Sequence, residues 1–218
     1  MMSHKDSVVK ANTDGIEYLF KKNKVDRIEG TGKILEPGKV EVDGKTYEAK
    51  NIVIATGSSV MPLPNIEIDE KKIVSSTGAL ELEKVPDKML VIGGGYIGLE
   101  LGTVWRRLGA DVTVVEFLDR ITPGMDEEIS KEMLKILKKE GIKFKLGTKV
   151  KEAKATTKGV TVKMEPANGG DEESMTVDVV LVSVGRKPNT EGLGIQDAGI
   201  ETDDRGRIKT YDHFKTNV

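Results

Sequence analysis

Three glycines and one acidic side chain are the residues of this 218-residue chain whose types and spacing could support chemistry. Gly93, Gly95 and Gly98 have the spacing G-x-G-x-x-G, and Glu116 follows them by about 20 residues. Such glycines let the backbone approach a pyrophosphate, and the N–H groups at the start of a following helix attract its charge. A carboxylate at that distance accepts hydrogen bonds from ribose hydroxyls. The spacing therefore predicts a dinucleotide site.

The sequence around these residues predicts the β–α–β unit that the motif needs. Met89–Ile92 is an apolar run that enters the glycines, and a helix is expected from about Tyr96 to Leu108. A second apolar run, Val112–Val115, ends at Glu116. A glycine triplet alone would be a weak signal, but this context makes it strong. The alternative is a buried β–α–β unit without a ligand, and the complete motif makes it much less favoured.

Glu116 indicates which dinucleotide is bound. A 2′-phosphate on the ribose would bring about −1.5 to −2 charges against the carboxylate. Like charges about 4 Å apart repel by roughly 4 kcal/mol per unit pair near a protein surface. Arg120 could instead hold that phosphate, but one arginine behind an acid is a poor clamp. The expected cofactor is NAD rather than NADP.

Composition excludes several classes of protein. The net charge of −2 and a pI near 5.9 give no field for nucleic acid or an acidic membrane. No apolar run approaches the 18 or so residues of a membrane span, and no secretory signal is recognisable, so we expect a cytoplasmic or mitochondrial matrix location. The chain has no cysteine, which excludes thiol catalysis and cysteine metal sites. His4 and His213 stand alone among polar neighbours, so no metal site is expected.

The first 85 residues mix helical and strand signals. Residues 3–23 should form a helix, and the turns Glu36–Gly38 and Asp43–Gly44 predict short antiparallel strands around them. The apolar run Ile52–Ala55 predicts a further strand. Ser75–Leu80 predicts a short capped helix.

Helical and strand signals also continue beyond Glu116. Residues 126–140 predict an amphipathic helix, followed by a strand over residues 142–146. Val160–Met164 and Met175–Val184 are expected to be strands, the second of them ending before Gly185. The side chains expected to face inward from the helix are Ile129, Met133, Ile136 and Leu137.

Five motifs in order carry a resemblance to a known family. They are IVIATGSSVMPLP, IVSSTGALEL, VIGGGYIGLELG, KFKLGTKV and LVSVGRKPNT. Together they resemble the flavin disulfide reductases, and within that family the dihydrolipoyl dehydrogenases, over residues 1 to 218. The resemblance implies an α/β, Rossmann-like FAD/NAD(P)-binding fold. It implies a three-layer NAD domain and a partial flavin-domain segment made of a helix and an antiparallel β-meander.

The resemblance also implies domains and cofactor contacts. Residues 1–85 would be part of the FAD-binding domain, residues 86–210 the NAD-binding domain, and residues 211–218 a return segment toward the FAD domain. Val150 would border the adenine and Gly185 the nicotinamide side. The residues expected at NAD are Gly93, Gly94, Gly95, Tyr96, Ile97, Gly98, Leu99, Glu100, Glu116, Val150 and Gly185; those expected at FAD are Gly32, Thr56, Gly57 and Ser58.

Three departures from the family pattern limit what this chain should do alone. The family's reaction needs a redox pair of cysteines, an earlier glycine fingerprint for FAD and a C-terminal interface domain with a catalytic histidine, and none is present. We therefore expect the central piece of a longer, homodimeric enzyme that serves the lipoyl-bearing acyltransferase of a 2-oxo acid dehydrogenase complex. The piece itself should have no catalytic residue, and apolar surface should be exposed on its first segment.

Two other readings remain. A stand-alone NAD-binding or sensing module would carry the same fingerprint. A complete small dehydrogenase would need a Tyr-x-x-x-Lys pair or a histidine relay, and neither is found.

Overall fold

The computed structural model describes residues 1–218 and divides into two compact units. The larger unit is Val60–Arg186, and the smaller unit joins Met1–Ser59 to Lys187–Val218. Strands β4 (Ser58–Val60) and β13 (Arg186–Pro188) pair where the chain passes between them. These units are defined by packing, whereas the assignment of residues 1–85, 86–210 and 211–218 to cofactor domains stays a prediction.

A five-stranded parallel sheet is the centre of the larger unit. In this sheet Ile92 pairs with both Val115 and Val182, so three strands end at the same level. The order of strands is β5 (Ile73–Val74), β12 (Val179–Val182), β6 (Lys88–Ile92), β7 (Asp111–Val115) and β8 (Lys143–Lys145). The chain runs from β6 to β7 and β8 on one side of β6, whereas β12 lies on the other side, which makes β6 a topological switch point.

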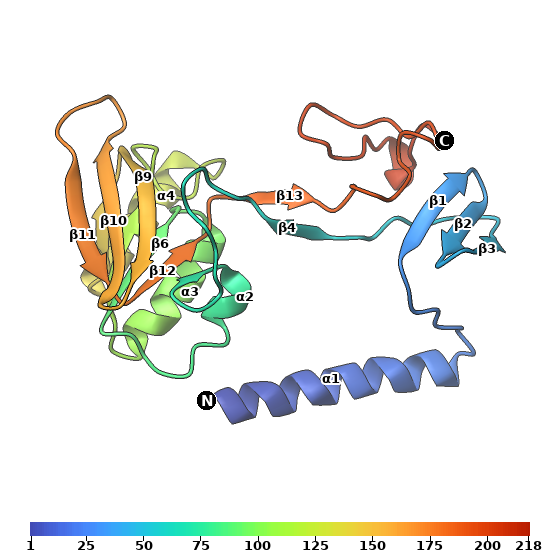
Figure 1. Cartoon of the computed structure of the whole chain (residues 1–218), viewed down its shortest axis with the longest axis horizontal. Helices are drawn as coiled ribbons and strands as arrows, with labels where there is room; N and C mark the ends of the chain where they lie inside the picture. The colour runs from blue at the N-terminus through green and yellow to red at the C-terminus, as the bar shows by residue number, and fades with distance from the viewer. The chain divides into compact units, whose positions relative to one another are not determined.

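Different elements cover the two faces of this sheet (Figure 1). Helices cover one face, and a three-stranded antiparallel sheet covers the other. This is a three-layer α/β arrangement of the Rossmann type, and it confirms the fold predicted from the sequence. The helices are α2 (Ser76–Ala79), α3 (Tyr96–Arg107) and α4 (Glu127–Lys139); the outer strands are β9 (Thr148–Thr156), β10 (Gly159–Pro166) and β11 (Glu173–Val177).

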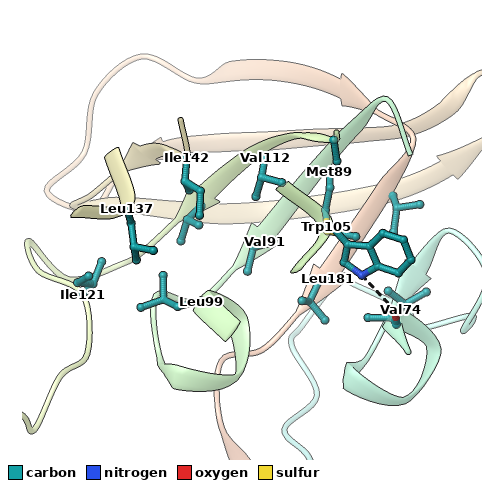
Figure 2. Packing of buried hydrophobic residues seen from close by; sticks show 14 residues of the cluster. Val74, Met89, Val91, Leu99, Trp105, Val112, Ile121, Leu137, Ile142 and Leu181 are labelled. Atoms are coloured by element: carbon teal, nitrogen blue, oxygen red, sulfur yellow. Dashed lines mark hydrogen bonds between the residues drawn. The ribbon is translucent and has the colours of Figure 1, made fainter. Parts of the chain in front are cut away.

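The continuous apolar runs in the sequence are explained by burial on both faces. Along β6, Met89 and Val91 pack with the helices, whereas Leu90 and Ile92 pack against β10 and its neighbours. Figure 2 shows the helix-side cluster, in which Trp105 is buried and its Nε1 donates to the Ala79 carbonyl at 3.2 Å. Each such side chain contributes roughly 1.5–3 kcal/mol when fully buried.

The smaller unit has a far thinner core. Its strands β1 (Gly32–Glu36), β2 (Lys39–Val42) and β3 (Lys45–Glu48) form the expected antiparallel meander. Helix α1 (Met2–Lys22) has no buried residue, so the apolar surface expected on the first segment is exposed. A short 3-10 helix, η1 (Asp212–Phe214), lies near the C-terminus. The buried hydrophobic residues of this unit are Ile34, Ile195, Ala198 and Ile200.

Two strand predictions are wrong. Ile52–Ala55 forms no strand: Val53 is 87% exposed, and only Ile54 packs on the small core. The expected strand Met175–Val184 is two strands in different sheets, which meet at Asp178. Two hydrogen bonds join Asp178 and Lys88. The Asp178 carboxylate accepts from the backbone N–H of Lys88, and the backbone N–H of Asp178 donates to the Lys88 carbonyl. This tie fixes the point where the chain changes sheet.

The predicted inward face of α4 is largely wrong. Leu137 is buried, but Ile129 is 58% exposed and Met133 and Ile136 also face outward. The buried side instead carries Ser130 and Leu137. Apolar residues occur on both sides of this helix, so periodicity alone could not decide its rotation.

Candidate dinucleotide-binding site

Two of the three fingerprint glycines are required by the protein's own packing. A Cβ at Gly93 would lie 2.6 Å from the Ser183 carbonyl oxygen, and Gly93 has a φ of 106°. A Cβ at Gly98 would lie 2.4 Å from the Gly93 carbonyl oxygen and 2.5 Å from the Ser183 hydroxyl oxygen. Only glycine fits at either position without moving backbone.

Gly95 differs from its two neighbours in the motif because no protein atom fills the space beside it. A Cβ at Gly95 would meet no heavy atom within 4 Å. The residue is the N-cap of α3, where free N–H groups and the positive end of the helix dipole are found. Tyr96 is 68% exposed on the same turn. An open glycine at a helix start leaves room for a phosphate to approach the backbone.

The Glu116 carboxylate lies at this glycine loop, as the sequence predicted. Glu116 is 8% exposed, its Oε2 accepts from the Gly94 N–H at 2.6 Å and its Oε1 accepts from the Leu118 N–H at 2.9 Å. An ionised carboxylate offers about four acceptor sites, so these two bonds leave capacity for ribose hydroxyls. The carboxylate therefore both supports the loop and remains able to accept further hydrogen bonds.

Val150 and Gly185 are on segments that reach the same edge of the sheet. The Thr148 N–H donates to the Glu116 carbonyl at 2.9 Å, so β9 begins beside Glu116, and Val150 is half-buried two residues later. Gly185 follows β12 and is exposed, with open space beside its α-carbon. The other predicted contacts, Ile97, Leu99 and Glu100, lie in the first turns of α3, where the Leu99 side chain is buried and could offer only backbone.

The residues predicted at FAD lie in the smaller unit. Gly32 begins β1, and both Gly32 and Gly57 have no neighbour where a Cβ would stand. Asn189 holds the segment around Gly57. The Asn189 side-chain amide donates to the Thr56 carbonyl at 3.0 Å, and the Thr56 hydroxyl donates to the main-chain carbonyl of Asn189 at 2.7 Å. The Ser59 hydroxyl donates to the Asn189 Oδ1 at 2.6 Å. Ser58, on β4, is half-buried.

Sequence reasoning missed three residues that shape these sites: Ser183, Thr122 and Asn189. The Ser183 hydroxyl donates to the Ile92 carbonyl at 3.0 Å, and the Thr122 N–H donates to the Gly94 carbonyl at 2.8 Å. Each acts through contacts between segments far apart in the chain. The only signal was positional for Ser183, which follows directly on an apolar strand that ends beside the glycines.

No group of three or more His, Cys, Asp or Glu side chains could hold a metal ion. No helix combines the length and the apolar character needed to cross a bilayer.

The chain belongs to the pyridine nucleotide-disulphide oxidoreductase family, whose sequence pattern matches residues 2–218. More specifically, it is 54% identical over its whole length to the dihydrolipoamide dehydrogenase of Chaetomium thermophilum. It is 55% identical, again over its whole length, to the mitochondrial dihydrolipoyl dehydrogenase of Dictyostelium discoideum. These similarities confirm the family recognised from the five sequence motifs.

A solved structure and the lengths of these relatives add to the comparison. The HOCl-induced flavoprotein disulfide reductase RclA of Escherichia coli matches 99% of this chain with a TM-score of 0.84 and 25% identity, and the match covers 49% of that chain. This chain spans 44% of the Chaetomium protein and 46% of the Dictyostelium protein. It therefore corresponds to about half of the relatives it matches.

Proposed function

We propose that the larger unit binds NAD at the glycine loop, as the NAD-binding portion of a dihydrolipoyl dehydrogenase. The observation that carries this proposal is the hydrogen bond between the Gly94 N–H and the Glu116 carboxylate. This bond supports the proposal because it holds the Glu116 carboxylate next to Gly95, where the backbone is open at the start of α3. An acid and an open helix start together fit the sugar and the pyrophosphate of a dinucleotide.

Each predicted contact has a role that its chemistry supports. The backbone N–H groups of the first turn of α3, over residues 95–98, would receive the pyrophosphate oxygens. Glu116 would accept hydrogen bonds from the adenosine ribose, and a 2′-phosphate would be repelled there. Val150 would border the adenine and Gly185 the nicotinamide side. These residues would bind and orient the cofactor, and no proton transfer is assigned to any of them.

The activity of the intact parent is part of the same proposal. The parent would oxidise a protein-bound dihydrolipoyl group to its disulfide and reduce NAD, with a cysteine pair and FAD carrying the electrons between them. Its partner would be the lipoyl-bearing acyltransferase of a 2-oxo acid dehydrogenase complex, and the parent would be a homodimer. Because this chain has no cysteine, we expect it alone to show no lipoamide turnover.

FAD contacts would come from the smaller unit. The open positions beside Gly32 and Gly57 would allow a flavin nucleotide to approach the backbone there. Thr56 and Ser58 would contribute from the same loop, although the Thr56 hydroxyl already donates to Asn189. We expect FAD binding to need the rest of the parent's flavin domain.

The test is a titration of the purified chain with NADH and with NADPH, together with its visible absorption spectrum. We expect saturable binding of NADH, with NADPH bound at least about tenfold more weakly because of the charge at Glu116. We also expect no flavin absorbance and no lipoamide reduction. Equal affinity for both nucleotides would contradict the role of Glu116, and absence of NADH binding would refute the proposed function.

A further inference from the structure

Thr122 has a backbone conformation that its residue type disfavours. Its φ is 47°, in the left-handed region, which is unusual for a β-branched residue. Pro123 follows it and restricts its backbone further. Strained residues of this kind persist only where surrounding contacts hold them, and they cluster at functional sites. We therefore expect the contacts of Thr122 to hold it in this conformation.

The backbone of Thr122 holds the glycine loop. Its N–H donates to the Gly94 carbonyl at 2.8 Å, while the Gly94 N–H donates to Glu116 at 2.6 Å. Ile121 is fully buried, and its Cγ2 lies 3.2 Å from where a Cβ on Gly94 would stand. The two peptide groups that flank Gly94 are thus fixed from two points of the connection between β7 and α4, Glu116 and Thr122.

The orientation of the Gly94 carbonyl determines the orientation of the next N–H group. A trans peptide is planar, so the Gly94 carbonyl and the Gly95 N–H point in opposite directions. Because the carbonyl points at Thr122, the Gly95 N–H points away from it. Gly95 is the N-cap of α3, with open space beside it. Thr122 thus fixes the direction of the first N–H group that a phosphate would meet.

The side chain of Thr122 is held in turn by the first turn of α4. Its Oγ1 lies 2.8 Å from the Ser130 hydroxyl oxygen, and Ser130 is 2% exposed. The Ser130 hydroxyl also makes a 3.0 Å hydrogen bond to the Asp126 carbonyl. A serine hydroxyl has one proton, so with that proton given to Asp126 the Thr122 hydroxyl is the donor to Ser130.

We propose that Thr122 and Ser130 are positioning residues for NAD, which hold the Gly95 N–H toward the pyrophosphate without touching the nucleotide. The proposal rests on the proposed function of the glycine loop as an NAD site. Loss of the Thr122–Ser130 hydrogen bond lets residue 122 relax toward negative φ. The Gly94 carbonyl then loses its donor, and the loop that meets the phosphate loses its order.

Five variants of the full 218-residue chain test this role by NADH titration. Thr122→Val and Ser130→Ala remove the same hydrogen bond from opposite ends, so each should weaken NADH binding by about fivefold. The double variant should be no weaker than either single variant, because one interaction is lost in all three. Thr122→Ser keeps a hydroxyl and should bind NADH with an affinity within about twofold of that of the unsubstituted 218-residue chain. The control is Thr156→Val, since the Thr156 hydroxyl makes a similar 3.0 Å bond to the Gly159 carbonyl in the β9–β10 hairpin.

Amide hydrogen exchange without nucleotide gives a readout independent of binding. The Thr122 N–H, protected by the Gly94 carbonyl, should exchange at least about fivefold faster in Thr122→Val and Ser130→Ala, while amides of β10 keep their rates. The positioning role would be overturned if both single variants bound NADH as tightly as the unsubstituted chain. It would also be overturned if the losses of affinity in the double variant were fully additive. Unchanged exchange at Thr122 would overturn it as well. If the unsubstituted 218-residue chain itself did not bind NADH, the proposed function would be overturned instead.

Discussion

The two units of this chain differ in how much of their apolar surface they bury. In the larger unit, the central sheet is covered on both faces, and two buried clusters contain most of its Val, Leu, Ile and Met side chains. In the smaller unit, four buried residues form the core, and α1 contributes none. A unit with its own two-sided core can fix a loop without outside help, whereas a unit without one needs more protein around it.

The candidate sites in the two units reflect this difference. The glycine loop is fixed by the buried residues Glu116 and Ile121 and by the half-buried Ser183. The Thr56–Ser58 segment is mostly exposed and depends on Asn189 for its hydrogen bonds. We therefore expect the NAD site to be formed in this chain, and the flavin contacts to be formed only with the rest of the parent.

The largest expected difference between the units is the cost of a leucine truncation. Leu181 is fully buried in the helix-side cluster, so Leu181→Ala should lower the free energy of unfolding by about 3 kcal/mol. Leu19 on α1 is half exposed, so Leu19→Ala should change it by less than about 0.5 kcal/mol. Urea unfolding followed by circular dichroism compares the pair. A similar loss in both variants would show that α1 is packed in solution.

Gly98 and Gly95 should separate packing from binding within the larger unit. Gly98→Ala places a Cβ against the Gly93 carbonyl and should cost about 2 kcal/mol or more of stability. Gly95→Ala meets no protein atom and should change stability by less than about 1 kcal/mol. The Gly95 variant should nevertheless bind NADH at least about tenfold more weakly, because its Cβ occupies the space left for the phosphate. Unaltered NADH affinity in Gly95→Ala would place the nucleotide elsewhere.

Glu116→Gln should affect both stability and cofactor choice. The amide removes the charge and one of the two acceptors for the Gly94 and Leu118 N–H groups, so stability should fall by about 1–2 kcal/mol. The preference for NADH over NADPH should shrink by about tenfold, since the repulsion of a 2′-phosphate is lost. Thermal unfolding and parallel titrations measure the two effects. A preference that survives in full would mean that another group excludes the phosphate.

The sequence was sufficient to predict the parts of the fold that depend on local pattern. The spacing of Gly93, Gly95, Gly98 and Glu116 predicted a β–α–β unit, and the register of Ile92 with Val115 explains why the acid reaches the loop. Alternating burial along β6 could be expected once its apolar run was assigned to a sheet covered on both faces.

The structural predictions that were wrong have a common physical origin, which is contact between segments far apart in the chain. The rotation of α4 is fixed by Ser130 against Thr122, and the break between β11 and β12 by Asp178 against Lys88. Neither pair has a sequence signature, because a hydroxyl or a carboxylate at such a position usually faces water. Ile52–Ala55 has a strand composition but no neighbouring strand to pair with. In each case the presence or absence of a tertiary contact determined the structure, and the local sequence pattern did not.

Asn189 gives the smallest expected effect and the closest test of the smaller unit. Asn189→Ala removes the side-chain bonds to the Thr56 carbonyl and the Ser59 hydroxyl, so stability should fall by about 1 kcal/mol. Amide exchange within residues 56–59 should speed up, while NADH binding in the larger unit stays unchanged. The control is Asn51→Ala, an exposed asparagine of the same unit. Weaker NADH binding in Asn189→Ala alone would show that the two units are energetically coupled, which would contradict an NAD site fixed only by the larger unit's own core.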